Sequence, residues 1–156
     1  MRKLRRRRKP QGYSPEQIVK MFGVGYDKVL TWLRTKVVRA SVRNEHRQWA
    51  PVLFSREDLL EVLLVAKLRK VHLGMTTIKA ALRTLRRVRV WDGHYILISA
   101  ERVQVARSVS AENQTLTIAV SLDKLREELG EKLAELETAK EAAVRAEHRH
   151  EHSSVA

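Results

Sequence analysis

The residues of this sequence that could perform chemistry are its histidines, carboxylates and hydroxyls, because the chain contains no cysteine. Nucleophilic catalysis needs a hydroxyl beside a base, and phosphate-handling enzymes often need a glycine-rich loop after a strand. The Ser and His residues stand outside any such motif, and most Asp and Glu residues fall on predicted helix surfaces. We therefore predict that the protein is not an enzyme and that it uses no cofactor.

Three histidines near the C-terminus are candidate metal ligands: His148, His150 and His152. They alternate with other residues in a polar tail, which supplies neither a prearranged geometry nor supporting hydrogen bonds. The sequence thus predicts no metal site. We expect residues 148–156 to form a flexible tail.

Lysine and arginine side chains make the protein strongly basic, with a formal charge of +13 over 156 residues. Residues 1–10, 11–91 and 92–156 carry net charges of +7, +10 and −4, respectively. An excess of this size favours polyanionic partners, and nucleic acid is the first of these. The uneven distribution predicts that one half of the chain binds the polyanion while the other half has a different task.

Residues 1–12 are predicted to form a basic flexible arm, because like charges repel and the segment has almost nothing to bury. A solubilising tail is the alternative to a nucleic-acid contact. The chain has no run near the roughly 18 apolar residues of a membrane span, and no apolar segment follows the basic start. We expect a cytoplasmic protein without a membrane partner, associated with the nucleoid if it is bacterial.

Two adjacent helices are predicted between residues 14 and 36. Ser14 stands at a cap position, with Pro15 at the first helical position and Gln17 where a capping box needs it. Glycines 23 and 25 permit a tight turn before a second periodic stretch, from residue 26 to 36. On this second helix the apolar and polar residues occupy different sides: Val29, Leu30, Trp32 and Leu33 are expected to be buried, and Asp27, Lys28, Thr31, Arg34 and Thr35 exposed.

The polar side of this second helix has two interpretations. A helix with short polar and basic side chains fits the major groove of DNA and can bond to base edges. An ordinary solvated helix has the same composition. Residues 37–43 and 48–54 have extended character on either side of a turn, so a two-stranded wing is predicted after the helix, with Pro51 weakening its return strand.

Two further helices are predicted to complete this domain. Ser55 caps the first, and the dense apolar residues of 59–68 make it the central core helix. Gly74 and Thr76 mark the boundary before a helix with an apolar stripe from Ile78 to Val88. Four arginines lie off this stripe and contact either phosphates or only solvent: Arg83, Arg86, Arg87 and Arg89.

Four sequence motifs follow one another along residues 23–76. They are Gly23-Val24-Gly25-Tyr26-Asp27-Lys28-Val29-Leu30-Thr31-Trp32-Leu33-Arg34 with Val38 and Ala40, then Phe54-Ser55-Arg56-Glu57-Asp58-Leu59, Ala66-Lys67-Leu68-Arg69 and Leu73-Gly74-Met75-Thr76. Together they resemble the winged helix-turn-helix of the MerR and excisionase superfamily over about residues 13–88. The resemblance implies that the helix from Tyr26 reads DNA and that the wing grips the flanking backbone. We assign residues 13–91 to this DNA-binding domain.

The second half of the chain is predicted to begin with a small β region at residues 92–121. Residues 95–98, 102–105 and 116–120 are short strand candidates, separated by turn-forming segments. Three short strands are too little to stand alone and should pack on the core or on another copy. Docking is the favoured role, and binding of a small-molecule effector is the alternative.

An amphipathic helix is predicted at residues 122–147. Its leucines follow a three-and-four spacing that suits a partner helix: Leu122, Leu125, Leu129, Leu133 and Leu136. We expect a coiled coil that forms a homodimer, and the resemblance agrees, since MerR-like proteins dimerise through a helix after the DNA-binding part. The alternative is a helix that folds back on its own domain.

The sequence thus predicts a mainly α protein with small β elements: a winged helix-turn-helix, a short antiparallel strand region and a C-terminal amphipathic helix. The predicted function is sequence-preferring binding of double-stranded DNA by a homodimeric transcription regulator. An excisionase-like architectural protein is the first alternative and an RNA-binding protein the second. Base edges are expected to face Tyr26, Asp27, Lys28 and Thr31. The DNA backbone is expected to contact Arg34, Lys36, Arg39, Arg43 and Arg47, together with Arg5, Arg6, Arg7 and Arg8 of the arm.

Overall fold

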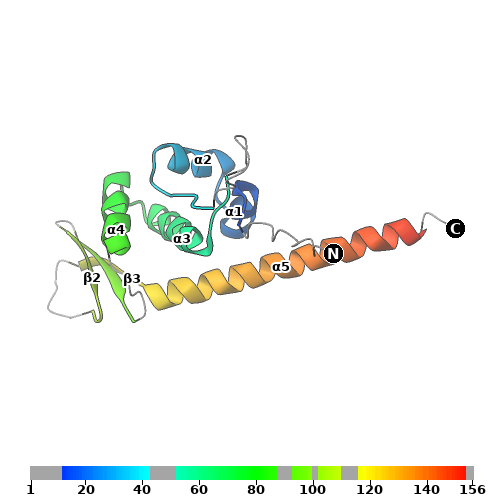
Figure 1. The fold of residues 1–156 in the computed structure, drawn as a ribbon. Helices are drawn as coiled ribbons and strands as arrows, with labels where there is room; N and C mark the ends of the chain where they lie inside the picture. The colour runs from blue at the N-terminus through cyan, green and yellow to red at the C-terminus, as the bar shows by residue number, and fades with distance from the viewer. Residues whose placement is uncertain (1–11, 43–51, 88–92, 100–101, 110–115, 154–156) are drawn as a thin grey trace, which may run out of the picture.

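The computed structural model describes residues 12–42, 52–87, 93–99, 102–109 and 116–153. These residues are mainly helical, with one small antiparallel sheet and a long C-terminal helix, as predicted (Figure 1). The elements in chain order are α1 (Pro15–Phe22), α2 (Tyr26–Arg34), α3 (Arg56–Lys70), α4 (Met75–Arg87), β1 (Tyr95–Ser99), β2 (Val103–Ala106), β3 (Leu116–Ser121) and α5 (Leu122–Ser153).

Capping boxes begin both α1 and α3, which confirms the two predicted helix starts. The Ser14 backbone N–H donates to Gln17 Oε1 at 2.9 Å, and the Gln17 N–H donates back to Ser14 Oγ at 3.4 Å. Ser55 and Asp58 exchange the same pair of bonds at 2.8 and 3.1 Å. Each box satisfies N–H groups that have no partner inside the helix.

A three-residue turn joins α1 to α2, and these two helices pack against each other. Gly23 ends α1 with a φ of 62°, in the left-handed region that a glycine adopts at little cost. Helix α2 ends two residues earlier than expected, at Arg34. Lys36 has a φ of 58° and turns the chain sharply, so that the N–H of Val37 donates to the Trp32 carbonyl at 2.8 Å.

This turn corrects the prediction of a strand at residues 37–43. Val37 and Val38 are buried at the end of α2 rather than extended, because their apolar side chains close the core beside Trp32. The described part of the wing reduces to one antiparallel bridge, in which the Val42 N–H donates to the Leu53 carbonyl at 3.2 Å. The predicted turn at residues 44–47 and Pro51 lie outside the described residues.

Helix α3 is the centre of the core, as its apolar density predicted. Ten of its residues are buried, including Leu59, Leu64 and Leu68. Helices α1, α4 and α5 all pack against it. The predicted stripe of α4 is buried at Ile78, Ala81, Leu82 and Leu85, while Val88 lies outside the described residues.

The three strands form a sheet of order β2-β1-β3 with antiparallel pairing on both sides of β1, close to the ranges predicted. Helix α4 contacts both β2 and β1. Ile96 and Ile98 are fully buried and belong to the same core as α3. The sheet therefore docks on the chain's own helical core.

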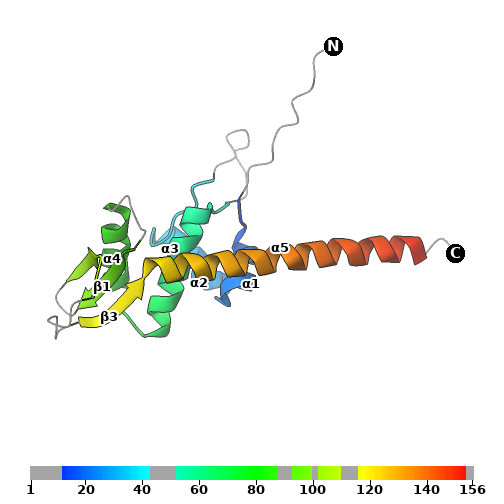
Figure 2. The same cartoon turned by 90° about the horizontal axis from the view of Figure 1, so that it is seen from below.

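Helix α5 follows β3 directly and lies along α1 and α3 before it extends away from the body (Figures 1 and 2). Leu122, Leu125 and Leu129 are buried in the chain's own core, so the prediction that they form a dimer seam is wrong. They fold back because α3 and β3 offer an apolar surface in the same chain. Leu133 and Leu136 are partly buried against that core. The helix also continues to Ser153, beyond the predicted end at residue 147.

Among the residues that the structure describes, no helix combines the length and the apolar character required to cross a bilayer.

Candidate nucleic-acid interface

The exposed side of α2 carries all four residues predicted to face base edges. Tyr26 is 42% exposed, and Asp27, Lys28 and Thr31 are also exposed. On the opposite side, Val29 and Trp32 are buried in the core. The polar side of the helix is therefore open at the surface rather than occluded inside the molecule.

Leu30 differs from its prediction as a buried residue, since it is 40% exposed. With nine residues, α2 presents only a narrow inner stripe to α1 and the core. Leu33 is partly buried beside that stripe. The buried side of α2 is accordingly narrower than the apolar pattern indicated, and its outer surface includes an aliphatic group beside the polar ones.

Hydroxyl groups on α2 and at its C-cap are already used as donors. Thr31 Oγ1 donates to the Asp27 carbonyl at 2.8 Å, and Thr35 Oγ1 donates to the Thr31 carbonyl at 2.7 Å. Such bonds to the preceding turn are common for Thr in helices. Each oxygen keeps its acceptor lone pairs, so both hydroxyls are set to accept a hydrogen bond from a ligand.

Tyr26 lies next to a carboxylate of the preceding helix. The pKa of Glu16 is lowered, first by a hydrogen bond from its own backbone N–H, then by the Ser14 hydroxyl, and to a smaller extent by the Tyr26 hydroxyl. Glu16 is on the surface at the start of α1. Tyr26 at the start of α2 therefore lies near the start of α1, and it remains 42% exposed.

Two polar contacts hold the segment that follows α2. Asp58 Oδ2 accepts hydrogen bonds from the Ser41 N–H and the Ser41 hydroxyl, both at 2.7 Å, in addition to its capping bond. Arg86 of α4 bonds to both carboxylate oxygens of Glu61 and donates to the Val37 carbonyl at 3.2 Å. These bonds fix the end of α2 against α3 and α4.

The predicted backbone-contacting residues fall into two groups. Arg34, Lys36 and Arg39 are exposed at the end of α2 and just after it. The others lie outside the described residues: Arg5, Arg6, Arg7, Arg8, Arg43 and Arg47. Of the four arginines predicted to lie off the apolar stripe of α4, Arg83 and Arg87 are exposed. Arg86 instead forms an ion pair with Glu61. Arg89 lies outside the described residues.

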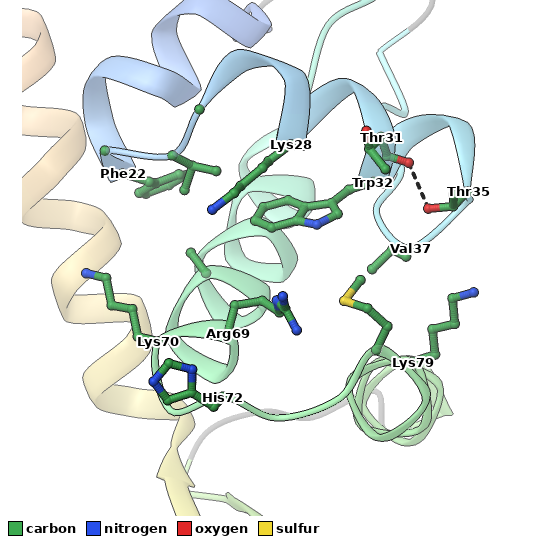
Figure 3. Close-up of a pocket in the computed structure, with 15 residues that line it drawn as sticks. Phe22, Lys28, Thr31, Trp32, Thr35, Val37, Arg69, Lys70, His72 and Lys79 are labelled. Atoms are coloured by element: carbon green, nitrogen blue, oxygen red, sulfur yellow. Dashed lines mark hydrogen bonds between the residues drawn. The ribbon is translucent and has the colours of Figure 1, made fainter.

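A groove of about 640 Å³ lies beside α2, between this helix and the turn that joins α3 to α4 (Figure 3). Its polar walls carry Lys28 of α2, Arg69 and Lys70 of α3, and Lys79 of α4, with His72 at the turn. Its apolar lining includes Phe22, Trp32, Val37, Ala66 and Met75. The remaining lining residues are Gly23, Val24, Gly25, Thr31 and Thr35.

Sequence reasoning did not single out Arg69, Lys70, His72 and Lys79. The sequence feature that could have identified them is the run of basic residues at the end of α3, just before Gly74. The helix dipole stabilises cations at that end of a helix. Which element those cations face depends on the turn after α3. His72 adopts a φ of 61° there and redirects the chain into α4.

Metal ligation finds no support within the described part of the chain, where no group of three or more His, Cys, Asp or Glu residues could hold an ion. His148 is exposed on α5. Residues 150 and 152 are also helical rather than part of the predicted flexible tail.

No protein-family model matches the chain, and no curated protein matches it.

Proposed function

We propose that the protein binds double-stranded DNA with a sequence preference, through the exposed side of α2. The observation that carries the proposal is that Tyr26, Asp27, Lys28 and Thr31 are all exposed on one short helix. A major groove admits a helix, and these side chains are of the kind that reads base edges. Hydrogen bonds from Ser41 to Asp58 and from Arg86 to the Val37 carbonyl hold the segment after α2 in place, which supports the fixed orientation that readout requires.

The proposed module is a winged helix-turn-helix of the MerR and excisionase type. Helices α1 and α2 with their three-residue turn supply the first part, and the Val42–Leu53 bridge supplies the base of a wing. Arg34, Lys36 and Arg39 then contact the sugar-phosphate backbone, along with the basic residues of the wing and the N-terminal arm. Such contacts set affinity and position rather than sequence.

We propose that the protein forms a homodimer through the outer part of α5. Leu122, Leu125 and Leu129 are not part of this interface, because they are buried in the chain's own core. Leu133 and Leu136 are only partly buried, and Val144 farther out is 52% exposed. This outer part extends past the body of the molecule (Figure 2). A helical stretch of this length is marginal alone in water, so pairing with a second copy stabilises it.

Selection of bound duplexes from a random pool, repeated at two salt concentrations, tests DNA readout. The proposal expects a consensus that survives added salt. Substituting Lys28→Ala together with Thr31→Ala should reduce discrimination by about 1 to 3 kcal/mol per lost base contact. Lys140→Ala on distant α5 is the matched control. Equal losses on consensus and random DNA would contradict the assignment of these residues.

A transcription regulator and an architectural excisionase-like protein share this module, and the proposed dimer favours the regulator because dimers read paired half-sites. A DNA-bending assay beside a promoter-reporter assay separates them. RNA binding is the weaker alternative, since Trp32 and Phe22 are buried and offer few stacking platforms for unpaired bases. Competition between duplex DNA and structured RNA tests it.

A further inference from the structure

Two large hydrophobic side chains are exposed one turn apart on α2. Tyr26 is 42% exposed and Leu30 is 40% exposed, and residues four apart on a helix are neighbours. The other large hydrophobic residues that are exposed in the described part of the chain each stand in a different element or loop: Val52, Val71, Val109 and Val144. Single exposed hydrophobic residues are common on any protein, whereas a neighbouring pair indicates a contact surface.

Leu30 lies in the middle of the outer side of α2. It comes three residues after Asp27 and four before Arg34, and both of these side chains are exposed. The groove beside α2 is lined by other residues of this helix, among them Lys28 and Thr31. Leu30 belongs neither to that lining nor to the core. It therefore faces the surface that the proposed function places in the major groove.

An aliphatic side chain at this position has one apolar partner among the base edges of a major groove. These edges present hydrogen-bonding groups, and thymine adds a methyl group at C5. A leucine that rests on a polar edge removes water from that edge without replacing the lost hydrogen bond, which costs free energy. Contact with the methyl group instead removes two apolar surfaces from water together. The chemistry of Leu30 thus favours thymine over cytosine at the position that it meets.

We propose that Leu30 determines specificity by contacting the C5 methyl group of a thymine in the bound duplex. This inference rests on the proposed function, because it requires the exposed side of α2 to enter the major groove. It adds an apolar contact to the polar readout proposed for Asp27 and Thr31. The contact distinguishes thymine from uracil, which has the same hydrogen-bonding groups but lacks the methyl group.

Replacement of thymine by uracil in the selected duplex tests the contact without altering any hydrogen-bonding group. Each thymine of the consensus is replaced singly by deoxyuridine, and binding of the full chain is measured by fluorescence anisotropy. We expect a position at which the duplex without the methyl group binds about three- to five-fold more weakly, as removal of one methyl group from an apolar contact predicts. A consensus without thymine, or equal binding at every position, would overturn the proposal. A random pool that yields no consensus overturns the proposed function, and this inference with it.

A substitution at Leu30 identifies the side chain that reads the methyl group. Leu30→Ala changes an exposed position, so it should keep the fold, which circular dichroism and urea denaturation verify. This variant should bind the thymine and uracil duplexes equally, without the difference of about three- to five-fold. Val109→Ala is the matched control, because Val109 is 45% exposed outside α2 and should keep the difference. Persistence of the difference in Leu30→Ala contradicts the assignment.

A methylated cytosine provides a second readout. At the position where uracil weakens binding, a cytosine–guanine pair should bind more tightly when the cytosine carries a C5 methyl group, and Leu30→Ala should abolish this gain. A gain that is equal in both proteins would overturn the proposal. If Leu30→Ala leaves DNA binding unchanged but alters the sedimentation of the free protein, the exposed pair contacts another copy of the chain and the proposal is likewise overturned.

Discussion

Arg86 and Glu61 form a bidentate ion pair that joins α4 to α3, with hydrogen bonds of 2.8 and 2.6 Å to the two carboxylate oxygens. The Arg86 side chain is 21% exposed and that of Glu61 is 12% exposed. The pKa of Arg86 is raised, first by the hydrogen bond to Glu61, against the opposing effect of burial. The same guanidinium donates to the Val37 carbonyl, so this pair also holds the turn that ends α2.

Breaking this pair on one side should destabilise the fold strongly. Glu61→Ala leaves Arg86 charged and partly buried without its partner, so we expect the free energy of unfolding to fall by about 3 kcal/mol. Replacing both residues together, as Glu61→Leu with Arg86→Met, should cost much less because no charge is left unpaired. Urea denaturation measures both. A double variant as unstable as Glu61→Ala would contradict this explanation.

Lys36 is held in a backbone conformation that favours glycine. Its φ of 58° places a non-glycine residue in the left-handed region just after α2. Lys36→Gly should therefore raise the free energy of unfolding by about 0.5 to 1 kcal/mol. The same change removes a proposed backbone contact and should weaken binding to all DNA sequences together. Lys36→Ala separates the effects, since it removes the charge but keeps the strain.

The lowered pKa of Glu16 gives a pH-dependent contribution to stability. Because the folded value lies below the ordinary 4.5, the contribution is present above that pH and is lost as the pH falls through the folded pKa. NMR titration of the Glu16 carboxyl measures it. Tyr26→Phe should raise this pKa only slightly and Ser14→Ala should raise it more, in the order of their effects. The reverse order would contradict the proposed contacts.

The two parts of α5 should respond differently to substitution. Leu129 is buried in the chain's own core, so Leu129→Ala should lower the free energy of unfolding by about 3 kcal/mol at any protein concentration. Val144 is exposed on the outer part, so Val144→Glu should barely affect folding but should weaken the proposed dimer. Denaturation and sedimentation at several concentrations measure the two effects. Lys140→Glu is the control for added negative charge.

If the Val144→Glu variant sediments like the unchanged protein, the outer part of α5 does not form the dimer interface. A concentration-dependent stability of Leu129→Ala would likewise contradict the placement of that leucine within its own chain.

The sequence alone determined the local features of this fold. The starts of α1 and α3 follow from Ser14 and Ser55, because a capping box forms between residues three apart and needs no distant partner. The strands from Tyr95 to Ser121 were readable for the same reason, since alternation and turn residues act over a few positions. The exposed polar side of α2 was predicted from helical periodicity.

Tertiary structure decided everything that depends on which surfaces meet. The leucine spacing of α5 suited either a second copy or the chain's own core, and the packing of α3 against it chose the core for Leu129. Arg86 and the exposed Arg87 both belong to the basic end of α4, and the contacts of Arg86 with Glu61 and the Val37 carbonyl distinguish the two. The groove brings Lys28 together with Lys79 across 51 residues. Periodicity reports which side of a helix is apolar, but it carries no information about the partner that covers that side.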